Sequence, residues 1–247
     1  MLVTSVEADA FGTNCFIVAT GPGQPCIVVD PGIGVVTRLD EVLAAHRLTP
    51  AAVLLTHGHL DHTFSVAPVC GARGITAYVH PADRELLAHP ELGLSEDLDL
   101  DSLFGGRLTF TEPDDVAELP DGGPITVAGL EITVDHAPGH TRGSVLFRLP
   151  GSESATLEVP GVRAGRGVAV PELCLSGDVL FAGSIGRTDL PGGSMDEMLA
   201  SLRDRILPLS DDTLVLPGHG PATTIGRERA VNPYLHEVMG PGKLRGW

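Results

Sequence analysis

The sequence predicts a mixed α/β protein whose strands end in polar turns at one edge of a sheet. Short apolar runs typical of buried strands recur along the chain, and stretches with helical spacing lie between them. Four of the apolar runs are followed closely by histidine or aspartate on a turn that contains glycine. Open sheets bind ligands outside the carboxyl ends of their strands, so this arrangement also predicts where a site would lie.

The length and composition fit a single domain. The chain has 247 residues, of which 43% are hydrophobic, and this is enough for one sizeable core. We predict one domain over residues 1–247, built from two similar halves at about 1–123 and 124–247. Ligand-type residues occur in both halves and neither half holds a full set, so we do not expect the halves to be independent.

The first half is predicted to alternate strands with short helices. Two strands at 15–19 and 26–29 are joined by a hairpin-type connection, and the second strand ends at Asp30. Thr37 would begin a helix, with Asp40 completing a capping box. The remaining predicted elements of this half are strands at 53–55 and 77–80 and short helices at 63–70 and 81–88.

The second half begins with a predicted hairpin at 125–134, because polarity alternates on each side of its turn. Further strands are predicted at 144–149, 173–175 and 214–216. Ser194 would begin the clearest helix, with Glu197 in a capping box. The predicted apolar stripe of this helix consists of Met195, Met198, Leu199, Leu202 and Ile206.

Two segments lack a clear period. Residues 90–123 are rich in acids and are predicted to be a solvated connection that flanks a cleft. Residues 150–167 are predicted to be an insertion or a long hairpin loop. His80 and His136 lie outside the motifs described below, and we expect both to be structural.

Charge and cysteine content narrow the function classes. The formal net charge is −16, which is unfavourable for a surface that binds a nucleic acid backbone. The N-terminus has no basic region typical of a signal peptide, and no apolar run reaches the ~18 residues of a membrane helix. We therefore expect a cytoplasmic protein with a small-molecule partner and no membrane partner, while its oligomeric state stays open. Four cysteines without a C-x-x-C pair are expected to be reduced and buried: Cys15, Cys26, Cys70 and Cys174.

One short stretch, Thr56-His-Gly-His-Leu-Asp-His62, has the composition of a metal-binding loop. Imidazole and carboxylate are ligands of zinc and similar metals. Neighbouring side chains point in different directions, so this close spacing suits two ions that share one loop better than one tetrahedral ion. On this interpretation His57 and His59 face one ion, and Asp61 and His62 face the other.

The rest of the chain offers three further ligand-type residues, each after an apolar run. They are His140 in Pro-Gly-His-Thr, Asp178 in Ser-Gly-Asp and His219 in Pro-Gly-His-Gly. Any one of these is commonly an ordinary turn, but the ordered series indicates a shared site. Glycine at these turns would let backbone approach a metal closely.

These motifs identify a resemblance that covers about residues 14–234. The loop matches the signature H-x-H-x-D-H, and His140, Asp178 and His219 match the later ligand motifs of metallo-β-lactamase-fold hydrolases. Ser184-Ile-Gly-Arg-Thr-Asp189 and Thr223-Thr-Ile-Gly-Arg-Glu-Arg229 resemble the glyoxalase II-like branch of these enzymes. The resemblance implies a four-layer αββα sandwich with metals at one edge of two packed sheets.

The resemblance also implies a dinuclear site with two divalent metal ions, zinc first, with iron and manganese as alternatives. His57, His59 and His140 would hold one ion, whereas Asp61, His62 and His219 would hold the other, with Asp178 bridging both. The two ions would supply a hydroxide nucleophile and polarise the substrate carbonyl. Asp61 would in addition orient the nucleophile or shuttle a proton.

Two further residues have alternative interpretations. Asp30 is either a simple turn residue or a carboxylate that holds a ligand histidine, as the family resemblance suggests. Arg187 either contacts the substrate and shapes the site, or forms a structural ion pair with Asp189 or Asp178.

The resemblance favours hydrolysis of thioesters of the S-lactoyl-thiol type. Only 28 residues follow His219, too few for the separate glutathione-binding domain of glyoxalase II, so another thiol carrier is an alternative. The lactamases of the family lack the bridging carboxylate that Asp178 would provide, which argues against β-lactam hydrolysis.

Two alternatives stay open. The first is a persulfide dioxygenase with one iron held by His57, His140 and Asp178. The second is a non-catalytic binding protein on the same fold, which the complete ligand series disfavours.

Overall fold

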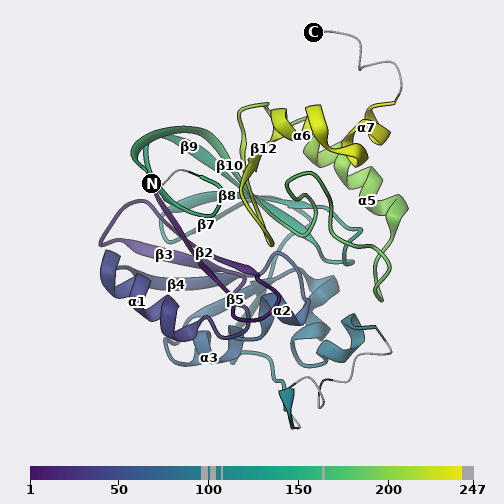
Figure 1. The fold of residues 1–247 in the computed structure, drawn as a ribbon. Coiled ribbons are helices and arrows are strands. Elements are labelled where there is room, and N and C mark those ends of the chain that lie inside the picture. The colour runs from purple at the N-terminus through teal and green to yellow at the C-terminus, as the bar shows by residue number, and fades with distance from the viewer. Residues whose placement is uncertain (96–99, 101–103, 107, 163–164, 241–247) are drawn as a thin grey trace.

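A computed structural model describes residues 1–95, 100, 104–106, 108–162 and 165–240 (Figure 1). Its strands form one hydrogen-bonded path in the order β12-β11-β10-β9-β1-β2-β3-β4-β5-β6, and β8 joins β9 while β7 pairs with β8. In the first half the strands are β1 (Leu2–Glu7), β2 (Asn14–Ala19), β3 (Pro25–Val29), β4 (Thr49–Leu54), β5 (Thr76–Val79) and β6 (Val116–Glu118). In the second half they are β7 (Gly122–Val127), β8 (Leu130–His136), β9 (Val145–Glu158), β10 (Gly165–Gly177), β11 (Leu214–Pro217) and β12 (Thr223–Thr224).

The first-half strands, β1 to β6, and the second-half strands, β7 to β12, form two strand groups that face each other across the main core. Alternate side chains of β2 point to opposite faces, so Phe16 and Val18 enter the core between the strand groups while Ile17 faces a helix layer. On the other side, Phe147 of β9 enters the same central core and Leu146 faces the second helix layer. The long strand β9 links the groups, because its far end pairs in parallel with β1.

Helices cover the outer face of each strand group and complete four layers (Figure 1). On the first-half side lie α1 (Val36–His46), α2 (Leu60–Thr63), α3 (Val66–Gly71) and the 3-10 helices η1 (Pro81–Leu87) and η2 (Pro90–Gly93). On the other side lie α5 (Met195–Ser201), its π-helical continuation η3 (Leu202–Ile206), α6 (Ile225–Val231) and α7 (Pro233–Met239). The fold is therefore the αββα sandwich expected from the sequence. Among the described residues, no helix is long and apolar enough to cross a membrane.

Several local expectations hold. The hairpin at 125–134 forms as β7 and β8, and the strands at 15–19 and 26–29 pair antiparallel as β2 and β3. Ser194 caps α5, because its hydroxyl accepts a hydrogen bond from the amide of Glu197 at 3.3 Å. The four cysteines are free and buried.

Three local expectations are wrong. Helix α1 begins at Val36 without a side-chain cap, so Thr37 and Asp40 form no capping box. Met195 is 42% exposed, because it occupies the first turn of α5, outside the stripe that packs on the sheet. The segment 150–167 is mainly strand, because β9 continues to Glu158 and β10 begins at Gly165.

Candidate metal centre

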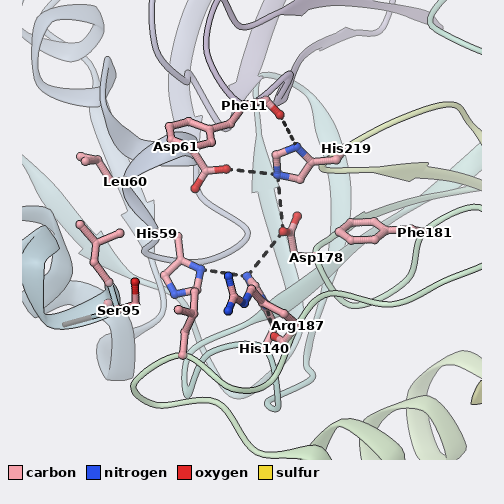
Figure 2. Close-up of a pocket in the computed structure, with 13 residues that line it drawn as sticks. Phe11, His59, Leu60, Asp61, Ser95, His140, Asp178, Phe181, Arg187 and His219 are labelled. Carbon is pink, nitrogen blue, oxygen red and sulfur yellow. Dashed lines mark hydrogen bonds and ion pairs between the residues drawn. The ribbon is translucent and has the colours of Figure 1, made fainter. Parts of the chain in front are cut away.

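The candidate ligands come from turns that follow strands on both sides of the sandwich. His57 follows the end of β4, and His59 is the residue before α2, which carries Asp61 and His62. His140 follows β8, while Asp178 and His219 follow β10 and β11, two neighbouring parallel strands. The loops from the two strand groups therefore converge on one site, as Figure 2 shows.

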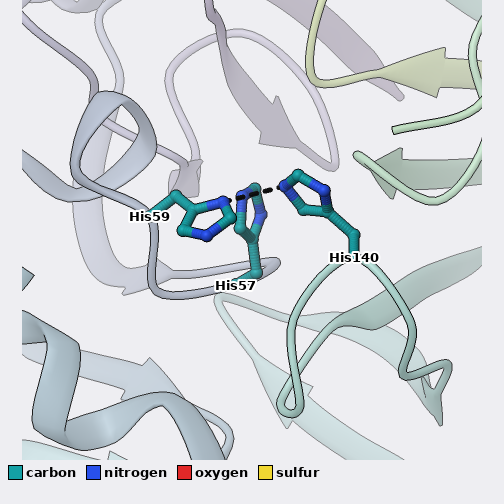
Figure 3. A group of neighbouring side chains, drawn as sticks. All are labelled: His57, His59 and His140. Atoms are coloured by element: carbon teal, nitrogen blue, oxygen red, sulfur yellow. Dashed lines mark hydrogen bonds between the residues drawn. The ribbon is translucent and has the colours of Figure 1, made fainter. Parts of the chain in front are cut away.

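All seven predicted ligand residues lie together. Within each of three sets, one nitrogen or carboxylate oxygen per residue lies within 4.8 Å of the others. The first histidine group is His57, His59 and His140, which Figure 3 shows. The second group is Asp61, His62 and His219. The remaining set joins His57 and His62 to Asp178.

Ring nitrogens face each other within each group. In the first group, Nδ1 of His59 lies 2.8 Å from Nε2 of His140. In the second group, Nε2 of His62 lies 3.2 Å from Nε2 of His219. Oδ2 of Asp61 is 3.1 Å from that same His219 nitrogen. Each group thus directs three potential ligand atoms at one small volume.

The Asp178 carboxylate lies between the two groups. Its Oδ1 is 3.3 Å from Nε2 of His62, and its Oδ2 is 3.5 Å from Nε2 of both His140 and His219. The contacts form a continuous chain from His59 through Asp178 to His219 (Figure 2). A carboxylate in this place can bind ions of both groups at once.

Carbonyl oxygens determine which ring nitrogen carries the proton. Carbonyls only accept, so Nδ1 of His140 must donate to the Arg187 carbonyl at 2.7 Å, and Nδ1 of His219 to the Phe11 carbonyl at 3.0 Å. Nδ1 of His62 likewise donates to the Asp30 carboxylate at 2.9 Å. In each of these three rings Nε2 is then the nitrogen that faces the site. In the second group two such nitrogens face each other at 3.2 Å, close enough for one cation to contact both.

Three buried polar atoms at the site have no hydrogen-bond partner among the described residues. They are Nε2 of His57, Nε2 of His59 and Oδ1 of Asp178. Buried polar atoms are nearly always paired, so the unpaired atoms of His57 and Asp178 indicate a missing partner. Nε2 of His59 is a separate case, because Nδ1 is the nitrogen of that ring that faces His140. Imidazole and carboxylate atoms are suitable ligands for divalent zinc, iron or manganese. The residues present therefore fit divalent metal ions.

Burial and neighbouring charges shift the pKa values of three residues in the directions that metal ligands require. For His62 and His219, burial is outweighed by the neighbouring Asp61 and Asp178 carboxylates, which raise the pKa of both rings. Burial lowers the pKa of His59 to about 3 and that of His57 well below its usual value, so both rings are neutral near pH 7. Burial would raise the pKa of Asp178, but the neighbouring His62 outweighs it and keeps that pKa low. Metals bind neutral imidazole and ionised carboxylate, so no deprotonation cost arises at these three residues.

Asp30 is the carboxylate behind His62. It is buried, and it accepts hydrogen bonds from the Thr56 amide at 2.8 Å and the Thr56 hydroxyl at 2.6 Å, in addition to the His62 contact. Its backbone lies in the left-handed region, with φ of 52°. It is therefore more than a turn residue, because it fixes the orientation of the His62 ring.

Arg187 pairs with Asp189 and not with Asp178. Its Nε and Nη2 atoms lie 2.7 and 2.8 Å from the two carboxylate oxygens of Asp189, in an exposed bidentate pair. The residue also lines the cavity beside the site. Its carbonyl orients His140, a role that no side-chain motif could have indicated.

The turn between β1 and β2 carries residues that the sequence did not single out. The Thr13 hydroxyl donates to Oδ2 of Asp61 at 3.1 Å, and the Phe11 carbonyl holds His219. The Asn14 amide group donates to the carbonyls of Pro217 and Gly220 on either side of His219. This turn therefore holds two members of the second group in place.

A cavity of about 510 Å³ opens onto the candidate ligands. Its volume is typical of small-molecule sites. The apolar part of its wall is formed by Phe11, Leu60, Leu94, Phe181 and Leu190, the polar part by His59, Asp61, Ser95, His140, Asp178, Arg187 and His219, and Gly93 also lines it. A substrate here would lie directly against both metal groups.

Residues 8–152 match the family described as the metallo-beta-lactamase superfamily. Two relatives are similar over nearly their whole length. An uncharacterized protein of Mycobacterium tuberculosis is 44% identical, over 95% of this chain and 98% of that protein. Hydroxyacylglutathione hydrolase GloC of Haemophilus influenzae is 31% identical, over 96% of this chain and 99% of that protein.

Two solved structures are similar in both fold and sequence. The BLEG-1 B3 metallo-beta-lactamase is 33% identical with a TM-score of 0.74, covering 94% of this chain and 99% of that one. TTHA1623, solved in a di-iron-bound form, is 33% identical with a TM-score of 0.70, covering 93% of this chain and 98% of that one.

Proposed function

Since the chain belongs to the metallo-beta-lactamase superfamily, we propose that it is a dinuclear metal-dependent hydrolase of S-lactoyl-type thioesters. The main support for two metal ions is the pair of ligand groups, whose nitrogens face each other and which have the Asp178 carboxylate between them. Support for the substrate comes from the likeness to hydroxyacylglutathione hydrolase GloC. A small-molecule substrate of this kind also accords with a cytoplasmic protein.

In this proposal the first histidine group would hold one ion and the second group the other, and Asp178 would be a ligand of both. When bound, the two ions would activate a water molecule and polarise the thioester carbonyl. Zinc is the first choice for this ligand set, and the di-iron form of TTHA1623 supports iron as the main alternative.

The residues of the chain would contribute binding, orientation and proton transfer. Asp61 borders the cavity, and its Oδ2 is held by Thr13, so it is placed to orient the attacking water or to accept its proton. The positive charge of Arg187, held at the rim by Asp189, would attract an anionic part of the substrate. The leucine and phenylalanine side chains of the wall would cover the acyl group and exclude bulk water.

The metal content tests the first part of the proposal. Elemental analysis of protein purified without chelators should find two divalent ions per chain, because the seven predicted ligands form two separate groups at the site. Removal of both ions should abolish hydrolysis, and adding zinc, iron or manganese back should show which metal restores it. Full activity with one ion or none would contradict the dinuclear proposal, and oxygen uptake with a persulfide would favour the one-iron alternative.

A substrate panel tests the second part. The value of kcat/KM for S-lactoyl thioesters should exceed that for RNA or a β-lactam by orders of magnitude, because a thioester carbonyl is electrophilic and expels a good leaving group. The chain's formal charge of −16 disfavours RNA in addition. Presenting the same lactoyl group on glutathione and on smaller thiols would identify the carrier.

β-Lactam hydrolysis is the second candidate function. The specific observation in its favour is the likeness to the BLEG-1 B3 metallo-beta-lactamase, at 33% identity over 94% of this chain. A kcat/KM for a β-lactam that equals or exceeds the thioester value would make this the better assignment. Rates that are equally low on all substrates, with no dependence on metal, would favour a non-catalytic binding protein.

A further inference from the structure

A buried carboxylate outside the candidate ligand set, that of Asp83, joins the two loops that carry the first histidine group. Asp83 lies in the 3-10 helix η1, and the residue is 1% exposed. Its Oδ2 accepts hydrogen bonds from the Gly58 amide at 2.8 Å and the Thr141 hydroxyl at 2.6 Å. Its Oδ1 accepts from the Gly143 amide at 2.7 Å. One carboxylate thus connects a loop of each strand group.

The atoms that Asp83 holds are next in sequence to the histidines. Gly58 lies between His57 and His59, and Thr141 directly follows His140. The carboxylate therefore acts one residue away from each member of the first group. None of its hydrogen bonds goes to Asp61, His62 or His219 itself, although Gly58 belongs to the loop that also carries Asp61 and His62.

Asp83 packs closely against the glycine residues of both loops. A Cβ atom at Gly143 would lie 2.6 Å from the Asp83 carboxyl carbon, and one at Gly58 would lie 2.8 Å from the Asp83 carbonyl oxygen. Both positions therefore need glycine for the close approach. On the far side, Ser144 accepts from the Thr141 amide and lies 2.8 Å from its hydroxyl, which orients that hydroxyl toward Asp83.

Helix η1 is itself attached to the loop side of β8. The His80 side chain accepts from the Ala82 amide at the start of η1. The His80 ring stacks on that of His136 at the end of β8, with centroids 4.2 Å apart and planes 7° apart. These two histidines, both expected to be structural, therefore attach the start of η1 to the end of β8. Helix η1 in turn carries Asp83.

We propose that Asp83 is a positioning residue that sets the metal affinity of the first histidine group. The proposal rests on the metal-binding part of the proposed function and is independent of the substrate. Without the carboxylate, the loops of His59 and His140 could move apart, and the 2.8 Å approach of their nitrogens would be lost. Partners that hold ligands in place commonly contribute 10–100-fold to metal affinity.

The test is the Asp83→Asn variant. Its amide offers one acceptor oxygen in place of two and directs an N–H group at a donor, so at least one of the three hydrogen bonds is lost. Chelator competition on the purified protein should show one ion bound about 10–100-fold more weakly and the other bound as in the wild type.

Glu228→Gln is the matched control. Glu228 is fully buried and also accepts from a backbone amide, a threonine hydroxyl and a third donor: Gly183, Thr223 and Asn232. It contacts neither loop of the first histidine group. This variant should lose comparable stability, and yet it should bind both ions with wild-type affinity. An equal loss of metal in both variants would mean that Asp83 acts only through general stability, which would overturn the proposal.

A second measurement does not depend on metal. In metal-free protein, the ring nitrogen NMR signals of His59 and His140 should shift in Asp83→Asn, while those of His62 and His219 stay in place. Unchanged signals of the first group, or wild-type affinity for both ions, would refute the role of Asp83. If the wild type binds no metal, the dinuclear proposal fails, and the NMR signals alone decide whether Asp83 positions these histidines.

Discussion

Replacing Asp178 with asparagine should lower kcat/KM by roughly 10²-fold or more and release bound metal. The carboxylate reaches both ligand groups, with Oδ1 3.3 Å from His62 and Oδ2 3.5 Å from His140 and His219. Asparagine keeps the shape but removes the negative charge between two cations. It also turns one acceptor into a donor that would point at a ligand nitrogen or an ion.

Metal content and kinetics should be measured on the same preparation of Asp178→Asn. Asp189→Asn provides the control, because it removes one negative charge from an exposed residue that pairs with Arg187 and contacts no candidate ligand. That control should retain both ions. If Asp178→Asn also keeps both ions and wild-type kcat/KM, Asp178 does not bridge the ions.

The order of ligand-type residues along the chain was sufficient to predict that they converge. His57, His140, Asp178 and His219 each follow a strand, and strand ends on one edge of the sandwich are brought together by the fold itself. Strand periods of two residues and glycine-containing turns are local signals, so β2, β3, β7 and β8 could also be predicted from short windows.

The residues that hold the ligands could not be predicted in this way. The Phe11 carbonyl reaches His219 across 208 positions of sequence, and any residue type supplies a carbonyl. Asp83 looks like an ordinary first-turn acid of a short helix until the structure places Gly58 and Thr141 beside it. The extension of β9 to Glu158 and the start of β10 at Gly165 could not be predicted for a related reason, because these polar residues are stabilised by pairing between the two strands.

The supporting residues also explain how two strand groups can share one site. Asp30 connects the end of β3 to Thr56 and His62, while Asp83 connects Gly58 to the loop after β8. A carboxylate outside the ligand set thus supports each of the two ligand groups. Such partners restrict the rings to the orientations that a metal needs and so reduce the entropy lost on binding.

Replacing Asp30 with alanine should be among the most destabilising changes at the site. The carboxylate accepts three hydrogen bonds from Thr56 and His62, and all three donors are buried. A buried donor left without a partner costs about 1–3 kcal/mol, so the free energy of unfolding of metal-free protein should fall by about 3 kcal/mol or more. Alanine is also strained at the φ of 52° that Asp30 adopts, which adds to the loss.

Asp30→Asn removes the negative charge but keeps the backbone conformation and part of the hydrogen bonding, so comparing it with Asp30→Ala separates these effects. Asparagine tolerates the left-handed region and keeps one acceptor oxygen, so its loss of stability in urea unfolding should be clearly smaller than that of alanine.

Both variants should weaken the ion held by His62 about 10–100-fold in chelator competition, because the ring loses its charged partner at 2.9 Å. The ion of the first histidine group should be affected less, since Asp30 reaches this group only indirectly, through the Thr56 hydroxyl that lies 3.1 Å from Nδ1 of His57. Equal weakening of both ions, or wild-type stability in Asp30→Ala, would show that Asp30 does not hold His62 in the way these contacts indicate.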